Sequence, residues 1–238
     1  MDMTVIKGIL FDKDGTLFDF ATTWEAWAHA FLTRLTNEDI PRATTIGAAI
    51  GFDYGAKSFS ADSVVIAGTP KDVVMVLDQY FPEYSQEALI DLINEEAGSA
   101  PQIEVTPLVP FLTALKARGL HLGVATNDAE EPALAHLDSA GATHLFDFVA
   151  GFDSGFGGKP DPGQLIGFAQ HVALDPATIA MIGDSTHDLL AAKAAGMLRV
   201  AVLTGMASAD DLAPFADVVL PDISHLPDWL DGWNAQRG

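Results

Sequence analysis

Short apolar runs mark the first residues of the chain and much of its second half. The first run, Val5 to Phe11, places Ile9, Leu10 and Phe11 in direct succession, which is typical of a strand covered on both faces in a parallel sheet. Comparable runs follow at residues 121–125, 148–150, 178–182 and 200–203, with a shorter one at 217–220. Helical spacing separates the later runs, and strands that alternate with helices favour a parallel sheet with right-handed crossovers.

The segment between the first two strands has a different pattern. Trp24, Trp27, Phe31 and Leu35 recur at intervals of three and four residues, as on one apolar face of a helix, and we interpret both tryptophans as core residues. Similar spacing returns in residues 73–81 and 89–93, whereas residues 37–70 are interrupted by glycines. We therefore expect an α/β core, residues 1–17 and 105–238, with an inserted helical cap, residues 18–104, that lies over the end of the first strand as a lid.

Composition favours a folded, acidic protein. The 238 residues are 49% hydrophobic, and 12 Lys and Arg stand against 33 Asp and Glu, for a net charge of -21. This charge repels nucleic acid and anionic membranes, so an enzyme for phosphorylated substrates would need a locally positive pocket. The chain has no cysteine, which excludes disulfides, thiolate metal sites and a cysteine nucleophile. We see no leader and no apolar run of membrane-spanning length, and we expect a soluble, cytoplasmic protein.

Two carboxylates follow the first predicted strand, in the stretch Asp12-Lys13-Asp14-Gly15-Thr16. Gly15 allows a sharp turn, so both carboxylates can converge on one small volume. Two carboxylates at one point repel each other, and a bound cation, a shared proton or a nearby lysine must offset that repulsion. The alternative is an Asp-rich turn that caps a helix beginning near Thr16.

Polar groups follow the other predicted strands as well. The second strand ends in Thr126 and Asn127, a glycine-rich loop after the third delivers Lys159, and Asp184 and Asp188 follow the fourth. Each group alone also fits an ordinary role, as a helix cap or a solvated lysine. Their repetition at successive strand ends favours one shared site, because open α/β sheets bind ligands at the carboxyl ends of their strands.

This ordered set resembles the haloacid dehalogenase superfamily, which has DxDG[TV] after the first strand, a Ser or Thr after the second, a Lys further on and an acidic pair after the fourth. The resemblance covers residues 1–20 and 105–220. It implies a Rossmann-like parallel sheet with strand order 3-2-1-4-5, and the insertion resembles the helical cap of phosphoglycolate-phosphatase-like members. Asp14 stands where the dehalogenases and the phosphonate hydrolases have no acid, which favours phosphate ester hydrolysis.

The resemblance implies a role for each catalytic residue. Asp12 is the nucleophile that forms an aspartyl-phosphate, and Asp14 protonates the leaving oxygen and later activates water. Thr126 binds a phosphoryl oxygen, assisted by the backbone N–H of Asn127. Lys159 neutralises phosphate charge and keeps Asp12 ionised.

A Mg²⁺ site is implied in the same way. Asp12, the backbone carbonyl of Asp14 and the carboxylate of Asp184 are the expected ligands, and Asp188 orients Asp184 or holds a water of the ion. Lys13 replaces an apolar residue that is common in the family. We expect its side chain to point away from the nucleophile, so that only its backbone contributes.

The sequence thus predicts a Mg-dependent phosphatase for a small, phosphoglycolate-like phosphate monoester, without a nucleic-acid or membrane partner, as a monomer or a homodimer. A phosphomutase of the same superfamily would share every motif. An esterase, suggested by Ser185 with Asp222 and His225, and a non-catalytic phospho-acceptor switch are more distant alternatives, since their motif order or chain length fits poorly. The candidates for reading the leaving group are the cap residues Phe18, Asp19, Lys57, Ser58 and Lys71.

Overall fold

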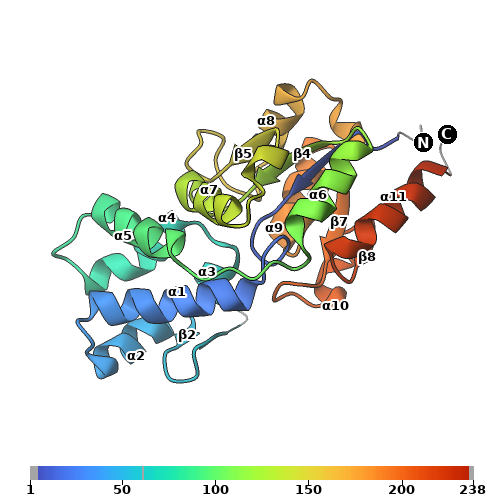
Figure 1. Ribbon diagram of the computed structural model, residues 1–238. Helices are drawn as coiled ribbons and strands as arrows, with labels where there is room; N and C mark the ends of the chain where they lie inside the picture. Colours follow the sequence, from blue (N-terminus) through green and yellow to red (C-terminus); the bar gives the residue numbers. More distant parts are fainter. Residues whose placement is uncertain (1–4, 61, 236–238) are drawn as a thin grey trace.

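A six-stranded parallel sheet forms the centre of the core (Figure 1). The computed structural model describes residues 5–60 and 62–235, so residues 1–4 and 236–238 of the predicted core and residue 61 of the predicted cap lie outside the described residues. The strands lie in the order β5-β4-β1-β6-β7-β8. Counted along the chain within this sheet, that order is 3-2-1-4-5 with a sixth strand added, which confirms the predicted topology. The strands are β1 (Gly8–Phe11), β4 (His121–Ala125), β5 (Phe148–Ala150), β6 (Ile179–Gly183), β7 (Leu198–Val202) and β8 (Val218–Leu220).

Helices cover both faces of this sheet, as the unbroken apolar run of β1 predicts. Ile9 and Phe11 belong to a cluster with residues of α6 and α11, whereas Leu10 faces the opposite cluster with residues of α8 and α9. The three successive side chains of one strand are therefore all buried, on alternating faces. The core helices are α6 (Leu108–Ala117), α7 (Glu130–Ser139), α8 (Gly163–His171), α9 (Thr186–Ala195), α10 (Ala209–Leu212) and α11 (Leu226–Ala235).

Residues 18–104, called the cap segment below, lie beside the sheet, to its lower left in Figure 1. Apart from Phe18, their buried apolar residues form a cluster separate from those of the sheet, and Trp24, Trp27 and Phe31 belong to it as predicted. The glycine-interrupted stretch that sequence patterns left unassigned forms a helix, a two-stranded hairpin and one helical turn. The elements are α1 (Phe20–Leu35), α2 (Ile40–Ala49), β2 (Phe52–Asp53), β3 (Ser58–Phe59), α3 (Val64–Ala67), α4 (Pro70–Leu77) and α5 (Gln86–Gly98).

Two adjacent linkers join the cap segment to the core. The Asp19 N–H donates to the Ile103 carbonyl at 2.8 Å, and the Val105 N–H donates to the Leu17 carbonyl at 3.0 Å. Asp19 also begins α1, because its carboxylate accepts from the Thr22 N–H at 2.7 Å. The linkers place α1 directly after the loop that carries Asp12 and Asp14. Among the described helices, none combines the length and the apolar character needed to cross a bilayer.

The close packing between β4 and α8 yields a test of the fold. A Cβ added at Gly123 would lie 2.7 Å from the Phe168 ring and 2.9 Å from Leu10 Cδ1. We expect Gly123→Ala to lower the free energy of unfolding by about 1–3 kcal/mol, the usual cost of overpacking, measured by urea unfolding. Gly232→Ala in α11 is the matched control, since a Cβ there meets nothing within 4 Å. A Gly123→Ala variant as stable as the control would contradict this packing.

Candidate active site

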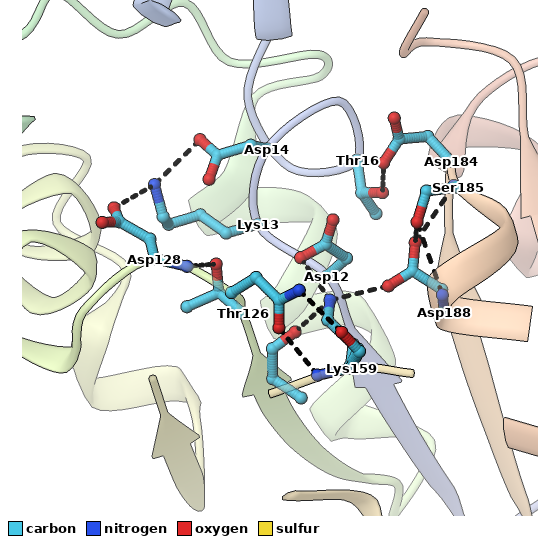
Figure 2. A network of polar contacts seen from close by, with 12 residues as sticks. Asp12, Lys13, Asp14, Thr16, Thr126, Asp128, Lys159, Asp184, Ser185 and Asp188 are labelled. Atoms are coloured by element: carbon cyan, nitrogen blue, oxygen red, sulfur yellow. Dashed lines mark hydrogen bonds and ion pairs between the residues drawn. The ribbon is translucent and has the colours of Figure 1, made fainter. Parts of the chain in front are cut away.

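The predicted site residues meet at the carboxyl end of the sheet (Figure 2). Phe11, the last residue of β1, pairs with Val124 of β4 on one side and with Ile182 of β6 on the other. Because the three strands are parallel and in register, the residues that follow them share one edge. Asp12, Asp14, Thr126, Asn127, Lys159 and Asp184 line a single pocket there.

Lys159 holds the first carboxylate in place. Its ammonium group lies 2.7 Å from Asp12 Oδ1 and 2.6 Å from Asp188 Oδ1, and it also donates to the Ala125 carbonyl at 2.7 Å. All three charged side chains are buried. Lys159 therefore bridges the ends of β1 and β4 and the start of α9.

Burial dominates the electrostatics of this cluster. It raises the pKa of Asp12, an effect that Lys159 opposes and that the Asp188 and Asp14 carboxylates increase. It also raises the pKa of Asp184 well above the ordinary value, with further contributions from Asp12 and Asp188. Burial acts in the opposite direction on Lys159, but Asp12 and Asp188 outweigh it and raise the Lys159 pKa. The lysine stays protonated, and the carboxylates attract further positive charge.

The donor set at this edge fits a hard divalent cation. Asp12, Asp184 and Asp188 each offer a carboxylate oxygen, and these oxygens lie within 4.8 Å of one another. Oxygen donors with net negative charge are what Mg²⁺ prefers in proteins. The backbone at Gly15 and at Gly205 packs so closely against the Asp184 carboxylate that a Cβ added at either glycine would overlap it. The two loops that carry these glycines therefore hold Asp184 in place. The cluster agrees with the predicted carboxylate ligands.

Asp188 has a second function that the sequence suggested only as an alternative. Its Oδ2 accepts from the Ser185 N–H at 3.0 Å and from the Ser185 hydroxyl at 2.7 Å, which forms a capping box at the start of α9. Its Oδ1 faces Lys159. The N-terminal capping box of α9 thus orients the Asp188 carboxylate toward the cluster. The Ser185 hydroxyl is engaged here, whereas His225 pairs with Asp222 on the surface, so an esterase triad from these residues is not supported.

Thr126 and Asn127 differ in what remains available to a substrate. Thr126 Oγ1 accepts from the Asp128 N–H at 3.0 Å, which leaves its hydroxyl proton free to donate. The Asn127 amide group donates to the Ala67 and Lys159 carbonyls, both at 2.9 Å, and its oxygen accepts from the Lys159 N–H at 2.8 Å. The Asn127 side chain therefore connects the core to the cap segment, so its amide groups are already engaged.

Lys13 departs from the expectation that only its backbone contributes. Its side chain points away from Asp12 but is completely buried, and its ammonium group lies 2.8 Å from Asp14 Oδ1 and 3.1 Å from Asp128 Oδ2. Burial alone would lower the Lys13 pKa, but Asp14 and Asp128 outweigh burial and raise it. The charged lysine fixes the Asp14 side chain beside Asp12. Lys13 and Asp128 are the site residues that sequence reasoning missed.

His136 completes this second cluster. Its Nδ1 lies 2.9 Å from the Lys13 ammonium, and its Nε2 lies 2.7 Å from the carbonyl of Ala97 in α5. Burial, together with Lys13, lowers the His136 pKa to about 4. A neutral ring accepts from Lys13 at Nδ1 and donates to Ala97 from Nε2. The loop that carries Asp14 is therefore connected to the cap segment through Lys13 and His136.

None of the five suggested cap residues lines the pocket within the described structure. Phe18 is buried in the core cluster, and Asp19 caps α1. Lys71 lies over the Phe152 ring, with its ammonium group 5.4 Å from the ring centroid. The pocket wall on this side is formed mainly by apolar residues of α1 and of the segment from α3 to α4.

The buried Lys13 makes the second cluster testable. We expect Lys13→Met to lower the free energy of unfolding by about 3–5 kcal/mol, because it leaves the buried Asp128 and the partly exposed Asp14 without their cation. Denaturant unfolding measures this loss. Lys7→Met is the matched control, because it replaces an exposed lysine directly before β1. Asp128→Asn added to Lys13→Met should recover part of the lost stability. A loss of unfolding free energy below about 1 kcal/mol in Lys13→Met would contradict the prediction, because it would be no larger than the contribution of a surface ion pair.

Comparisons with known proteins agree with this geometry. A family model of haloacid dehalogenase-like hydrolases matches residues 6–196. The "Probable phosphatase IndB" of Dickeya dadantii (strain 3937) is 32% identical over 216 residues, which cover 90% of this chain and 88% of that protein. A phosphoglycolate phosphatase of Neisseria meningitidis (serogroup A / serotype 4A, strain Z2491) is 29% identical and covers 95% of this chain and 90% of its own.

A solved structure shows the same fold. The crystal structure of a predicted phosphoglycolate phosphatase from Haemophilus somnus 129pt superposes with a TM-score of 0.70 at 23% identity, covering 95% of this chain and 99% of that one. The family model spans the strand ends described above, from two residues before β1 to the residue after α9. The chain belongs to the haloacid dehalogenase-like hydrolases.

Proposed function

We propose that the protein is a Mg²⁺-dependent phosphatase that hydrolyses a small phosphate monoester through an aspartyl-phosphate on Asp12. The observation that carries the proposal is the buried Asp12 carboxylate held at 2.7 Å by Lys159, with Asp14 positioned separately by Lys13. One carboxylate is thereby presented as a nucleophile, and the other is free to exchange protons. The relatives named as phosphatases support the same chemistry.

In the first step, a carboxylate oxygen of Asp12 attacks phosphorus while the bond from phosphorus to the leaving oxygen breaks. Asp14 donates a proton to the leaving oxygen, which departs as a neutral alcohol. Lys13 keeps the Asp14 carboxyl group near the nucleophile without touching Asp12. The products of this step are the alcohol and the aspartyl-phosphate.

In the second step, a water molecule attacks phosphorus and Asp14 takes its proton. The bond between phosphorus and the Asp12 oxygen breaks, so inorganic phosphate leaves and Asp12 returns to its carboxylate form. Thr126, the Asn127 N–H and Lys159 hold the phosphoryl oxygens through both steps. When bound by Asp12, Asp184, Asp188 and the Asp14 carbonyl, Mg²⁺ supplies positive charge that lets a phosphoryl anion approach this acidic edge.

Release of inorganic phosphate from phosphate monoesters in the presence of Mg²⁺ tests the proposal directly. Transfer of the phosphoryl group to a sugar, with no phosphate released, would identify a phosphomutase. Phosphoglycolate belongs in the first substrate panel because several relatives carry the name phosphoglycolate phosphatase.

Substitution of the two aspartates separates their roles. Asp12→Asn removes the nucleophile, so we expect no turnover with any substrate. Asp14→Asn removes the proton shuttle, which is worth about 10² to 10⁴ in rate. An activated aryl phosphate needs no protonation of its leaving group, so Asp14→Asn should still be phosphorylated and the phosphorylated enzyme should accumulate.

Rapid-quench kinetics with intact-protein mass analysis measures that accumulation. The expected result is a burst of nitrophenolate and one added phosphoryl mass on Asp14→Asn, and neither on Asp12→Asn. A folded, Mg²⁺-loaded Asp14→Asn variant that shows no burst and no added mass would remove Asp14 from the acid and base roles.

The affinity for Mg²⁺ should depend on pH. Because burial raises the pKa of Asp12 and Asp184, these groups keep protons to a higher pH than ordinary carboxyl groups, and protons compete with the metal. We expect the dissociation constant to rise as the pH falls from about 8 to 6, by up to about tenfold per pH unit for each proton displaced.

Calorimetric titration in two buffers of different ionisation enthalpy counts the protons that Mg²⁺ releases. Exhaustive chelation should abolish phosphate release, and added Mg²⁺ should restore it. A pH-independent affinity with no proton release would show that the carboxylates are already ionised, and activity after chelation would exclude the metal role.

A further inference from the structure

The part of the pocket that faces away from Asp12 is apolar. From the cap segment, the wall is formed chiefly by the side chains of Phe20, Trp24, Trp27, Val65, Ile66 and Val73. The same wall contains the Thr69 hydroxyl, which donates to Asp72 Oδ2 at 2.7 Å in the capping box of α4. It also contains the indole N–H of Trp24, which is buried and has no hydrogen-bond partner within the described residues. The leaving group of a bound phosphate ester extends toward this wall, because the nucleophile and the lysine occupy the opposite side.

None of the four Lys and Arg residues of the cap segment lines this pocket among the described residues. Arg34 pairs with Glu95 and Glu96, Arg42 donates to the Tyr80 carbonyl, and Lys71 lies over Phe152. Lys57 is exposed in the turn of the β2–β3 hairpin. The cap segment therefore offers no cation to a second negative group on the substrate.

The charged groups that do line the pocket belong to the core. They are Asp12, Asp14, Asp128, Asp184 and Lys159, with His187 at the start of α9 as the other ionisable side chain. Lys159 already faces Asp12 and Asp188 and is the partner of the phosphoryl group. The carboxylates repel any further anion.

We propose that this site selects phosphate esters whose leaving alcohol is uncharged and apolar, and that the apolar wall of the cap segment determines this specificity. A carboxylate placed against the wall loses its water and gains no cation from the cap segment, only the neutral N–H of Trp24, which is unfavourable. A hydrocarbon group in the same place is favoured, because it leaves water for an apolar surface. Phosphoglycolate, which carries a carboxylate next to its leaving oxygen, is thus a poor substrate. The inference rests on the proposed phosphatase function.

A matched pair of esters tests the inference. Isobutyl phosphate and 2-phosphoglycolate have leaving groups of similar size and shape, and the glycolate alkoxide is no worse a leaving group. Steady-state phosphate release with Mg²⁺ gives kcat/KM for each. We expect isobutyl phosphate, and benzyl phosphate beside it, to exceed 2-phosphoglycolate by at least about tenfold, because a buried charge left unpaired is discriminated strongly.

A charge placed in the wall should reverse the preference. Ile66→Lys puts a cation at a half-buried position that lines the pocket, and we expect it to raise the ratio of kcat/KM for 2-phosphoglycolate over isobutyl phosphate by about tenfold, mainly through KM. Ile90→Lys is the matched control, because Ile90 is equally half-buried against the same apolar cluster and does not line the pocket. The control should leave the ratio unchanged.

The outcomes are distinct. A wild-type protein that prefers 2-phosphoglycolate overturns the inference and leaves the phosphatase function intact. If His187→Gln then lost that preference, His187 would be identified as the partner of the substrate carboxylate. An equal change of the ratio in both lysine variants also overturns it. No phosphate from any ester would overturn the proposed function itself. If Ile66→Lys does not fold, the wild-type comparison of the three esters decides the matter.

Discussion

The concentration of buried negative charge at the ends of parallel strands is the constraint on which the rest of the structure depends. Two buried lysines face these carboxylates within the described residues, so the site keeps an excess of negative charge when the carboxylates are ionised. Such an excess in a low-dielectric interior favours the binding of a cation or of protons. The groups concerned are the buried Asp12, Asp128, Asp184 and Asp188 and the partly exposed Asp14, with the buried Lys13 and Lys159.

The two lysines divide the site into two functional parts. Lys159 acts from the core and holds Asp12, whereas Lys13 leaves Asp12 free and holds Asp14. His136 extends the second part to the carbonyl of Ala97 in the cap segment. The group that we propose as the proton shuttle is thus bound to the same network as the cap, and any displacement of α5 from the core breaks a buried hydrogen bond next to Lys13.

Much of the core could be predicted from sequence, because its signals are local. Apolar runs located the strands, and polar residues placed directly after them identified the shared edge. The partners of Lys13 could not be predicted in this way. Asp128 and His136 lie 115 and 123 residues along the chain from Lys13, and they approach it through long-range packing, in which α7 lies against α5 of the cap segment. Asn127 is similar, since its motif position indicates phosphate binding, while its side chain is used to bind the Ala67 carbonyl.

Chemistry and selection are assigned to different parts of the chain. In the proposed mechanism, the groups that act on phosphorus come from the core and treat any phosphate monoester alike, because they act only on the phosphoryl group and the bridging oxygen. Discrimination then falls to residues that touch the leaving group, and in the cap segment these are aromatic and aliphatic. The net charge of -21 already opposes the approach of anions, and the lysine and the metal site offset that opposition for one phosphoryl group. A second anionic group would meet the same field without a partner, so an apolar wall adds affinity for neutral leaving groups and strengthens the rejection of charged ones.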